Sequence, residues 1–259
     1  MPFKVSRLNG RRLLAAGLAI VMLASVVTIT VTGFTDGGED NGSTLSEITD
    51  CPAVDKSDGP RISFSNRPIW CLTSGVSYTA VFETSEGDIH VALDTKNTPE
   101  TTNNFVVLAR YGYYDNTLLF RMDPTIGIIQ GGAPTTNSTF DPGPGYNIPD
   151  EGGTYLPNND GSVTGPFSYV PGQLVMARSR GPNSSGAQFF FTTNESVSLL
   201  DSSLEIPGSG SYIVFGNTDD LGLKLLQKMM DLYESDPESP YGGGPIRDLE
   251  LLSVAITEN

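Results

Sequence analysis

The sequence predicts a mainly β fold, a closed or sandwiched sheet accompanied by two helices. Short apolar runs punctuated by Gly and Pro recur between residues 78 and 215, as is typical of many short strands. Only two segments, 97–114 and 219–235, place apolar residues at helical spacing. A final run, "LELLSVAI" at 249–256, supplies a closing strand. Many strands with few helices are typical of β-barrels and β-sandwiches.

The first two strands are predicted to form a hairpin. The runs "YTAVFET" (78–84) and "DIHVALD" (88–94) alternate, and Ile89, Val91 and Leu93 lie on one side of the second run. The turn "SEGD" joins the two runs. We therefore expect paired antiparallel strands here.

The two helices have recognisable signals. In the first, Thr98 is the expected N-cap, and Pro99 occupies the first turn, where its missing N–H costs nothing. Apolar and small residues then follow at helical spacing: Phe105, Leu108, Ala109 and Gly112. The second helix repeats this pattern with Leu221, Leu225, Met229 and Leu232.

Residues 1–34 are predicted to be a cytoplasmic tail followed by a transmembrane signal anchor. Four basic residues precede an uncharged stretch, 13–34, of a length that can span a bilayer. Positive charge before the span keeps the amino terminus in the cytoplasm, so a single-pass membrane protein with an extracytoplasmic domain is expected. Secretion after signal cleavage is the alternative, which the long apolar run and the missing Ala-x-Ala site disfavour.

Residues 35–77 are predicted to be an extracytoplasmic linker, because they are rich in Gly, Ser, Asp and Pro. Cys51 and Cys71 are the only cysteines. A disulfide between them would persist outside the cytoplasm and would stabilise the fold by about 3 kcal/mol. Two free buried thiols are the alternative.

Composition excludes several classes of function. The formal net charge of the chain is −15, and the four basic residues of the tail lie before the span, so the part after the span is more negative still. Such a charge repels phosphate backbones and argues against nucleic acid as a partner. The single histidine, His90, alternates with Ile89 and Val91 in a strand, so a Ser-His-Asp or Cys-His site would have to use it. No nucleophile elbow, phosphate-binding loop or imidazole-rich metal site is present, and no cofactor is expected.

Three segments have polar residues at the borders of apolar runs: "LLFRMDPTIGIIQGGAP" from Leu118, "PGQLVMARSRGPNSSGAQFFFTT" from Pro171, and "SYIVFGN" from Ser211. Together with "GDIHVALD" and "TPETTNNFVVLA", they resemble the cyclophilin-type peptidyl-prolyl isomerases over about residues 78–256. The resemblance implies an eight-stranded antiparallel closed β-barrel, capped by two helices, for the domain at 78–259.

The resemblance also implies site residues. An X-Pro bond rotates against a barrier of about 20 kcal/mol, and an arginine beside the prolyl nitrogen can donate to its lone pair as the amide twists. Arg121 matches that arginine. Gln130 would hold the arginine and substrate, Gln188 would bind the peptide backbone, and Phe190 would form the floor of the proline pocket. The remaining matched substrate-binding residues are Met176, Ala177, Leu199, Tyr212 and Ile128.

The sequence departs from the family pattern near the predicted pocket. Phe120 replaces a common histidine, and the stretch from Arg121 to Gln130 is one residue longer than usual. A pocket phenylalanine is missing, so Ile126 or Ile128 would supply an aliphatic wall. Leu199 stands where cyclosporin-sensitive relatives have tryptophan, which predicts weak inhibition by that drug.

Two functions are compatible with these observations. The first is a peptidyl-prolyl cis-trans isomerase that assists the folding of exported proteins and binds their Pro-containing segments. The second is a catalytically weak or inactive module that binds such segments at the cell envelope. We expect a monomer attached to a bacterial membrane through its anchor, the bacterial setting being implied by the resemblance alone.

Overall fold

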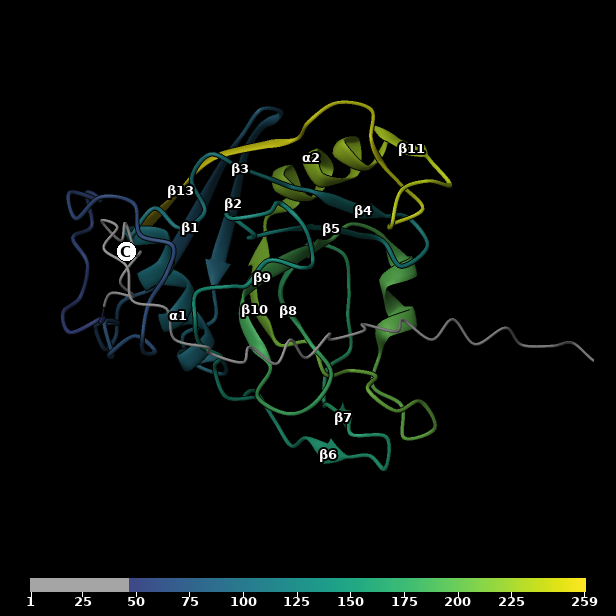
Figure 1. Ribbon diagram of the computed structural model, residues 1–259, viewed down its shortest axis with the longest axis horizontal. Coiled ribbons are helices and arrows are strands. Elements are labelled where there is room, and N and C mark those ends of the chain that lie inside the picture. Colours follow the sequence, from purple (N-terminus) through teal and green to yellow (C-terminus); the bar gives the residue numbers. More distant parts are fainter. Residues whose placement is uncertain (1–46) are drawn as a thin grey trace, which may run out of the picture. The chain divides into compact units, whose positions relative to one another are not determined.

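The computed structural model describes residues 47–259, which are built around one curled sheet (Figure 1). Its nine strands are ordered β3-β13-β1-β2-β10-β8-β9-β5-β4, and all pairs are antiparallel. The strands are β1 (Tyr78–Thr84), β2 (Gly87–Leu93), β3 (Thr117–Leu118), β4 (Arg121–Asp123), β5 (Ile128–Gly131), β8 (Gln173–Arg178), β9 (Ser185–Thr192), β10 (Val214–Thr218) and β13 (Glu250–Glu258).

Smaller elements complete the described part of the chain. Two hairpins pair β6 (Leu156–Pro157) with β7 (Val163–Thr164) and β11 (Tyr233–Ser235) with β12 (Gly243–Pro245). The helices are α1 (Pro99–Arg110), α2 (Asp220–Met230) and the short 3₁₀ helix η1 (Glu195–Leu200). The predicted mainly β fold with two α-helices is therefore confirmed.

The predicted closed barrel is wrong. In the described residues, the sheet ends at β3 on one side and β4 on the other, and these two edges do not pair. The physical reason lies in their length and connection. The strands have two and three residues and are separated only by Leu119 and Phe120, so neither offers a ladder long enough to close the sheet.

The predicted membrane anchor belongs to residues 1–34, which precede the described range. Residues 13–34 lie outside the described part of the chain. Among residues 47–259, no helix has both the length and the apolar character needed to cross a bilayer.

The first hairpin forms as the sequence predicts, but the first helix begins differently. The side chain of Thr98 makes no cap; its hydroxyl donates to the carbonyl of Asp94 at 3.2 Å. The carboxylate of Glu151 instead accepts the free backbone N–H groups of Glu100, at 3.1 Å, and Thr101. Burial raises the pKa of Glu151, and these hydrogen bonds act in the opposite direction. A distant carboxylate thus replaces the predicted local cap.

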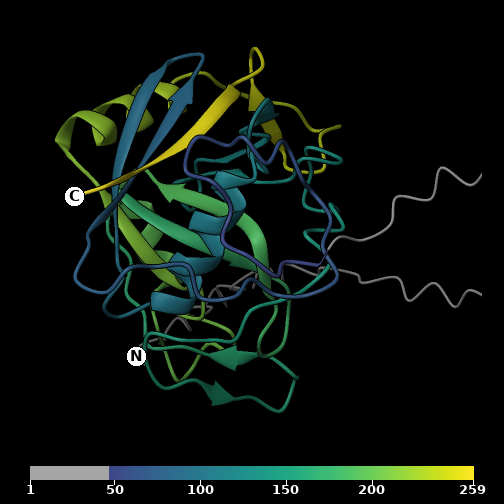
Figure 2. The same cartoon turned by 90° about the vertical axis from the view of Figure 1, so that its left-hand side faces the viewer.

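The described part of the predicted linker, residues 47–77, packs onto the domain instead of hanging free. We call it the strap. It runs beside α1 (Figure 2), and its Ile48, Phe64 and Leu72 are buried in the main hydrophobic core. Isolated apolar residues in a polar segment have no periodicity, which is why composition suggested a linker.

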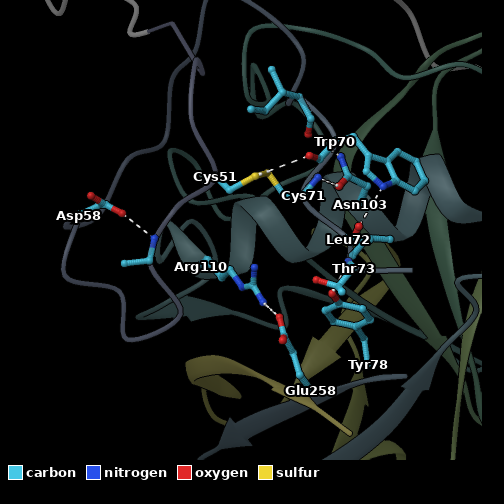
Figure 3. The surroundings of a disulfide bond; sticks show 12 residues. Cys51, Asp58, Trp70, Cys71, Leu72, Thr73, Tyr78, Asn103, Arg110 and Glu258 are labelled. Carbon is cyan, nitrogen blue, oxygen red and sulfur yellow. Dashed lines mark hydrogen bonds and ion pairs between the residues drawn. A yellow bond between two sulfur atoms is a disulfide. The ribbon is translucent and has the colours of Figure 1, made fainter. Parts of the chain in front are cut away.

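Side chains and a disulfide fasten the strap (Figure 3). Cys51 and Cys71 are bonded, as the sequence predicted. The side chain of Asn103 in α1 accepts from the backbone N–H of Cys71 at 2.7 Å and donates to the carbonyl of Ile69 at 2.9 Å. Because the sheet covers one side of α1 and the strap covers another, every residue from Thr101 to Arg110 is buried.

Candidate active site

Strand register gathers the candidate residues on one face of the sheet. Arg121 on β4 is opposite Gln130 on β5, which is opposite Phe190 on β9, which is opposite Val175 on β8. Residues directly opposite in a sheet project to the same face, and chain neighbours project to the other. The neighbours accordingly lie in the main core: Met122, Ile129, Phe189, Phe191, Leu174 and Met176.

A chain of hydrogen bonds crosses this outer face. Arg121 Nη1 donates to Gln130 Oε1 at 3.0 Å, and Gln130 Nε2 donates to Gln188 Oε1 at 2.9 Å. Gln188 Nε2 then donates to the carbonyl of Ser138 at 3.4 Å. The order of donors and acceptors fixes both amides, so each glutamine orients the next and the first orients the arginine.

Glycine brings the two glutamine strands together. Just after Gln130, Gly132 has a φ of +86°, and a Cβ there would lie 2.8 Å from the carbonyl oxygen of Ala187. A side chain would push β5 away from β9 and break the amide contact. The glycines of the "QGG" run therefore allow the close strand approach that positions Gln130 against Gln188.

Two residues that sequence reasoning missed also contact Arg121. Its Nη2 lies 2.9 Å from Asp123 Oδ2, and its Cζ lies 5.8 Å from the ring centroid of Tyr241. Its Nε is buried and has no partner in residues 47–259. Strand alternation could have placed Asp123, two residues after Arg121, on the same face. No local signal marks Tyr241.

An apolar cluster, separate from the main core, lies on the same outer face. Its buried members are Ile128, Tyr169, Val175, Phe190 and Val197. Half-buried residues pack around them: Ile126, Phe167, Ala177, Leu200, Tyr212 and Val214. The predicted residues Ile128, Ala177, Phe190 and Tyr212 therefore come together. An aliphatic and aromatic surface of this kind suits a small apolar ring.

Tyr212 is fixed at the edge of this cluster. Its ring packs edge-on against Phe190, with centroids 5.4 Å apart, and the hydroxyl of Tyr169 accepts from its N–H and donates to its carbonyl, at 2.9 and 3.0 Å. Burial raises the pKa of Tyr212, whereas the positive charges of Arg121 and Arg178 act to lower it. Tyr212 therefore stays a neutral donor at physiological pH.

A comparison with known families identifies the family of the chain. A family model described as "Cyclophilin type peptidyl-prolyl cis-trans isomerase/CLD" matches residues 79–251. The chain belongs to this family.

Cyclophilin relatives cover part of the chain in each case. A probable peptidyl-prolyl cis-trans isomerase B of Mycobacterium leprae is 33% identical over 160 residues, which are 61% of this chain and 50% of that protein. The spliceosome-associated protein CWC27 homolog of Danio rerio is 31% identical over 175 residues, 66% of this chain and 32% of that protein. The chain thus spans half or less of the length of these curated relatives.

A solved cyclophilin has the same fold. The crystal structure of a cyclophilin-type peptidyl-prolyl cis-trans isomerase of Cryptosporidium parvum, determined in the presence of the dipeptide Ala-Pro, is 28% identical. It matches with a TM-score of 0.51 over 70% of this chain and 99% of its own.

Two residues predicted from the cyclophilin pattern lie elsewhere. Met176, predicted as a pocket wall, is fully buried in the main core and is not part of the apolar cluster. Alternation along β8 explains this, because Met176 projects opposite to Val175 and Ala177. Leu199 is 68% exposed and outside the apolar cluster, whereas the next residue, Leu200, packs against it.

A cavity of about 440 Å³ lies away from this cyclophilin site. Residues of the strap, α1 and Ile148 line it. The amides of Asn66, Asn103 and Asn104 in its wall are already hydrogen-bonded within the protein. None of the residues paired across the sheet with Arg121, namely Gln130, Phe190 and Val175, lines this cavity.

Proposed function

We propose that this chain catalyses cis-trans isomerisation of X-Pro peptide bonds, with Arg121 stabilising the twisted amide. The observation that supports this most is the placement of a hydrogen-bonded guanidinium on the same sheet face as an apolar cluster. The proposal follows from the requirements of the reaction, which makes and breaks no covalent bond. A catalyst has only to bind the rotated state better than the planar states.

Binding of the proline ring would use the apolar cluster. Phe190, Ile128, Ala177 and Tyr212 would contact the ring, which fixes one side of the rotating bond. Gln188 would hold the peptide backbone, and the acyl group on the other side of the bond would turn. Holding one side while the other rotates lowers the entropy that must be lost to reach the transition state.

The rate gain would come from a charge-assisted hydrogen bond. As the C–N bond twists, the nitrogen loses conjugation and becomes an acceptor, and a guanidinium N–H can donate to it. Within the part of the chain that the structure describes, only two of the five N–H groups of Arg121 are used, by Gln130 and Asp123, so donors remain. Hydrogen bonds to charged groups contribute about 1.5–3 kcal/mol, which corresponds to roughly 10- to 150-fold in rate.

The test is a protease-coupled assay of an Ala-Pro peptide with the full chain. Arg121→Ala should lower kcat/KM by roughly 10- to 150-fold, because the donor to the prolyl nitrogen is lost. Arg180→Ala is the matched control, since this arginine is exposed and, among the described residues, pairs only with Asp160. Equal rates for Arg121→Ala and the parent chain would contradict the assigned role.

A second function has its own supporting observation. Asp123 pairs with Arg121, and an aliphatic Ile128 stands near the pocket where the family has a phenylalanine, so a module that binds Pro-containing segments with little turnover also fits. Calorimetric binding of the peptide without any acceleration of isomerisation would favour this function.

The proposed setting is the extracytoplasmic side of a cell membrane, where the chain would act as a monomer on exported proteins. The apolar stretch at 13–34 and the disulfide in the strap support this, because disulfides persist outside the cytoplasm. External protease should digest the domain in intact cells, and the domain should sediment with membranes. Protection from the protease would refute the orientation, and a soluble extracellular form would indicate signal cleavage.

A further inference from the structure

Arg121 lies on a strand that does little to hold it. Strand β4 has three residues and lies at the edge of the sheet, where β5 is the only strand paired with it among residues 47–259. A long side chain on such a strand has many accessible rotamers, and ordering it costs conformational entropy. Gln130 fixes one terminal nitrogen, which alone leaves the guanidinium free to swing about that hydrogen bond.

Asp123 restrains the other terminal nitrogen. It lies two residues along the same strand, and its carboxylate is 2.9 Å from Nη2 of Arg121. The carboxylate itself is held by its own turn, in which it accepts from the backbone N–H of Thr125 at 3.1 Å. Hydrogen bonds at both terminal nitrogens define the plane of the guanidinium.

Tyr241 covers the guanidinium from a distant part of the chain. It lies in the segment between β11 and β12, which contacts β4 at the yellow end of the chain in Figure 1. Its hydroxyl accepts from the backbone N–H of Thr139 at 3.0 Å, and its ring lies 6.2 Å from the ring of Phe120. Tyr241 is therefore anchored independently of the arginine that it contacts.

The loop at 138–139 joins the two arrangements. Its Ser138 carbonyl accepts from Gln188, and its Thr139 N–H donates to Tyr241. The Gln130–Gln188 pair and Tyr241 are thus hydrogen-bonded to the same piece of backbone. This fixes the positions of the groups on the two sides of Arg121 relative to each other. None of these contacts adds to the main core, so stability of the fold does not explain them.

We propose that Asp123 and Tyr241 are positioning residues for Arg121. Together with Gln130, they hold the guanidinium in one plane, so that its remaining N–H groups stay directed at the prolyl nitrogen. This inference rests on the proposed isomerase function. Both residues would act through Arg121 and neither belongs to the apolar cluster assigned to the proline ring, so their loss should affect kcat more than KM.

The kinetic test compares disruptive with conservative substitutions in the full chain. Tyr241→Leu and Asp123→Ala should each lower kcat by roughly five- to tenfold with KM unchanged, because the guanidinium is misplaced. Tyr241→Phe keeps the ring and Asp123→Asn keeps an acceptor, so both should recover most of the loss. Phe140→Leu and Asp160→Ala are matched controls on the exposed surface and should not change kcat.

A second measurement does not depend on catalysis. The NMR signal of Arg121 Nε–H, assigned by its disappearance in Arg121→Lys, should carry a ring-current shift from Tyr241 and exchange slowly with water. Tyr241→Leu should remove the shift, Tyr241→Phe should keep it, and Asp123→Ala should speed the exchange.

The outcomes separate this proposal from the proposed function. If the parent chain shows no isomerase activity, the proposed function fails, while the NMR comparison still decides whether the two residues fix Arg121. Unchanged kcat and an unchanged Nε–H signal in Tyr241→Leu and Asp123→Ala would overturn the proposal. A faster Asp123→Asn would overturn it for Asp123, because the carboxylate would then be weakening the charge of Arg121.

Discussion

The protein contains two arginines in nearly the same local arrangement. Arg121 lies 2.9 Å from an oxygen of Asp123 and 5.8 Å from the ring centroid of Tyr241, and Arg178 lies at the same two distances from Asp150 and Tyr155. These two distances therefore do not distinguish them. What differs is the set of remaining partners and the access to solvent.

Arg178 serves the fold. Its side chain is 3% exposed and that of Asp150 is 8% exposed, against 16% and 19% for Arg121 and Asp123. Its other donors go to the carbonyls of Ser211, at 2.9 Å, and Gly181, which ties three loops together. Arg121 instead binds a side-chain amide and keeps donors free beside an apolar cluster. The N–H groups that have no partner within the described protein therefore distinguish the proposed functional arginine from the structural one.

The largest expected effect would come from breaking the buried pair. Arg178→Met should lower the free energy of unfolding by about 3–5 kcal/mol, because the carboxylate of Asp150 would stay buried without its partner. Urea unfolding measures this. The double variant Arg178→Met/Asp150→Leu should be more stable than the single one, since no buried charge is left. A single variant as stable as the parent chain would show that water reaches Asp150.

The removal of Arg121 should reduce activity strongly and stability only slightly. Arg121→Ala should change the free energy of unfolding by about 1 kcal/mol or less, as expected for a partly exposed pair, while activity falls. The same urea titration measures it. If Arg121→Ala destabilised the protein as much as Arg178→Met, the contrast between a functional and a structural arginine would be lost.

A loss of stability at or below the lower end of the range for the buried pair is expected from a contact remote from both arginines. Replacing Cys51 and Cys71 together by Ser should lower the free energy of unfolding by about 3 kcal/mol, because the unfolded chain gains a free loop. The kcat/KM for an Ala-Pro peptide should be unchanged wherever the variant remains folded. A loss of activity in the folded variant would indicate that the strap supports the site as well as the fold.

Three of the residues predicted for the site lie together because motif positions fall on a regular sheet. Arg121, Gln130 and Phe190 lie in one row since the strands pair in register. Met176 was misplaced because a motif match ignores which face a residue occupies, although alternation along its strand would have assigned it to the core.

Other features depend on contacts that no local pattern encodes. Tyr241 reaches Arg121 across about two thirds of the domain sequence, through a turn whose position is set by tertiary packing. Glu151 caps α1 from a distant loop, so Thr98, with the right residue type in the right place, was not needed as a cap. Closure of the sheet failed at two strands too short to be judged from composition.

The strap has a practical meaning for the unit that folds cooperatively. The family match begins at residue 79, yet three apolar side chains needed to fill the interior come from before that position. Trimming the chain to residue 79 would expose one side of α1 to solvent and would leave cavities at the positions of Ile48, Phe64 and Leu72. We therefore expect the smallest piece of this chain that folds on its own to be longer than the segment that the family model matches.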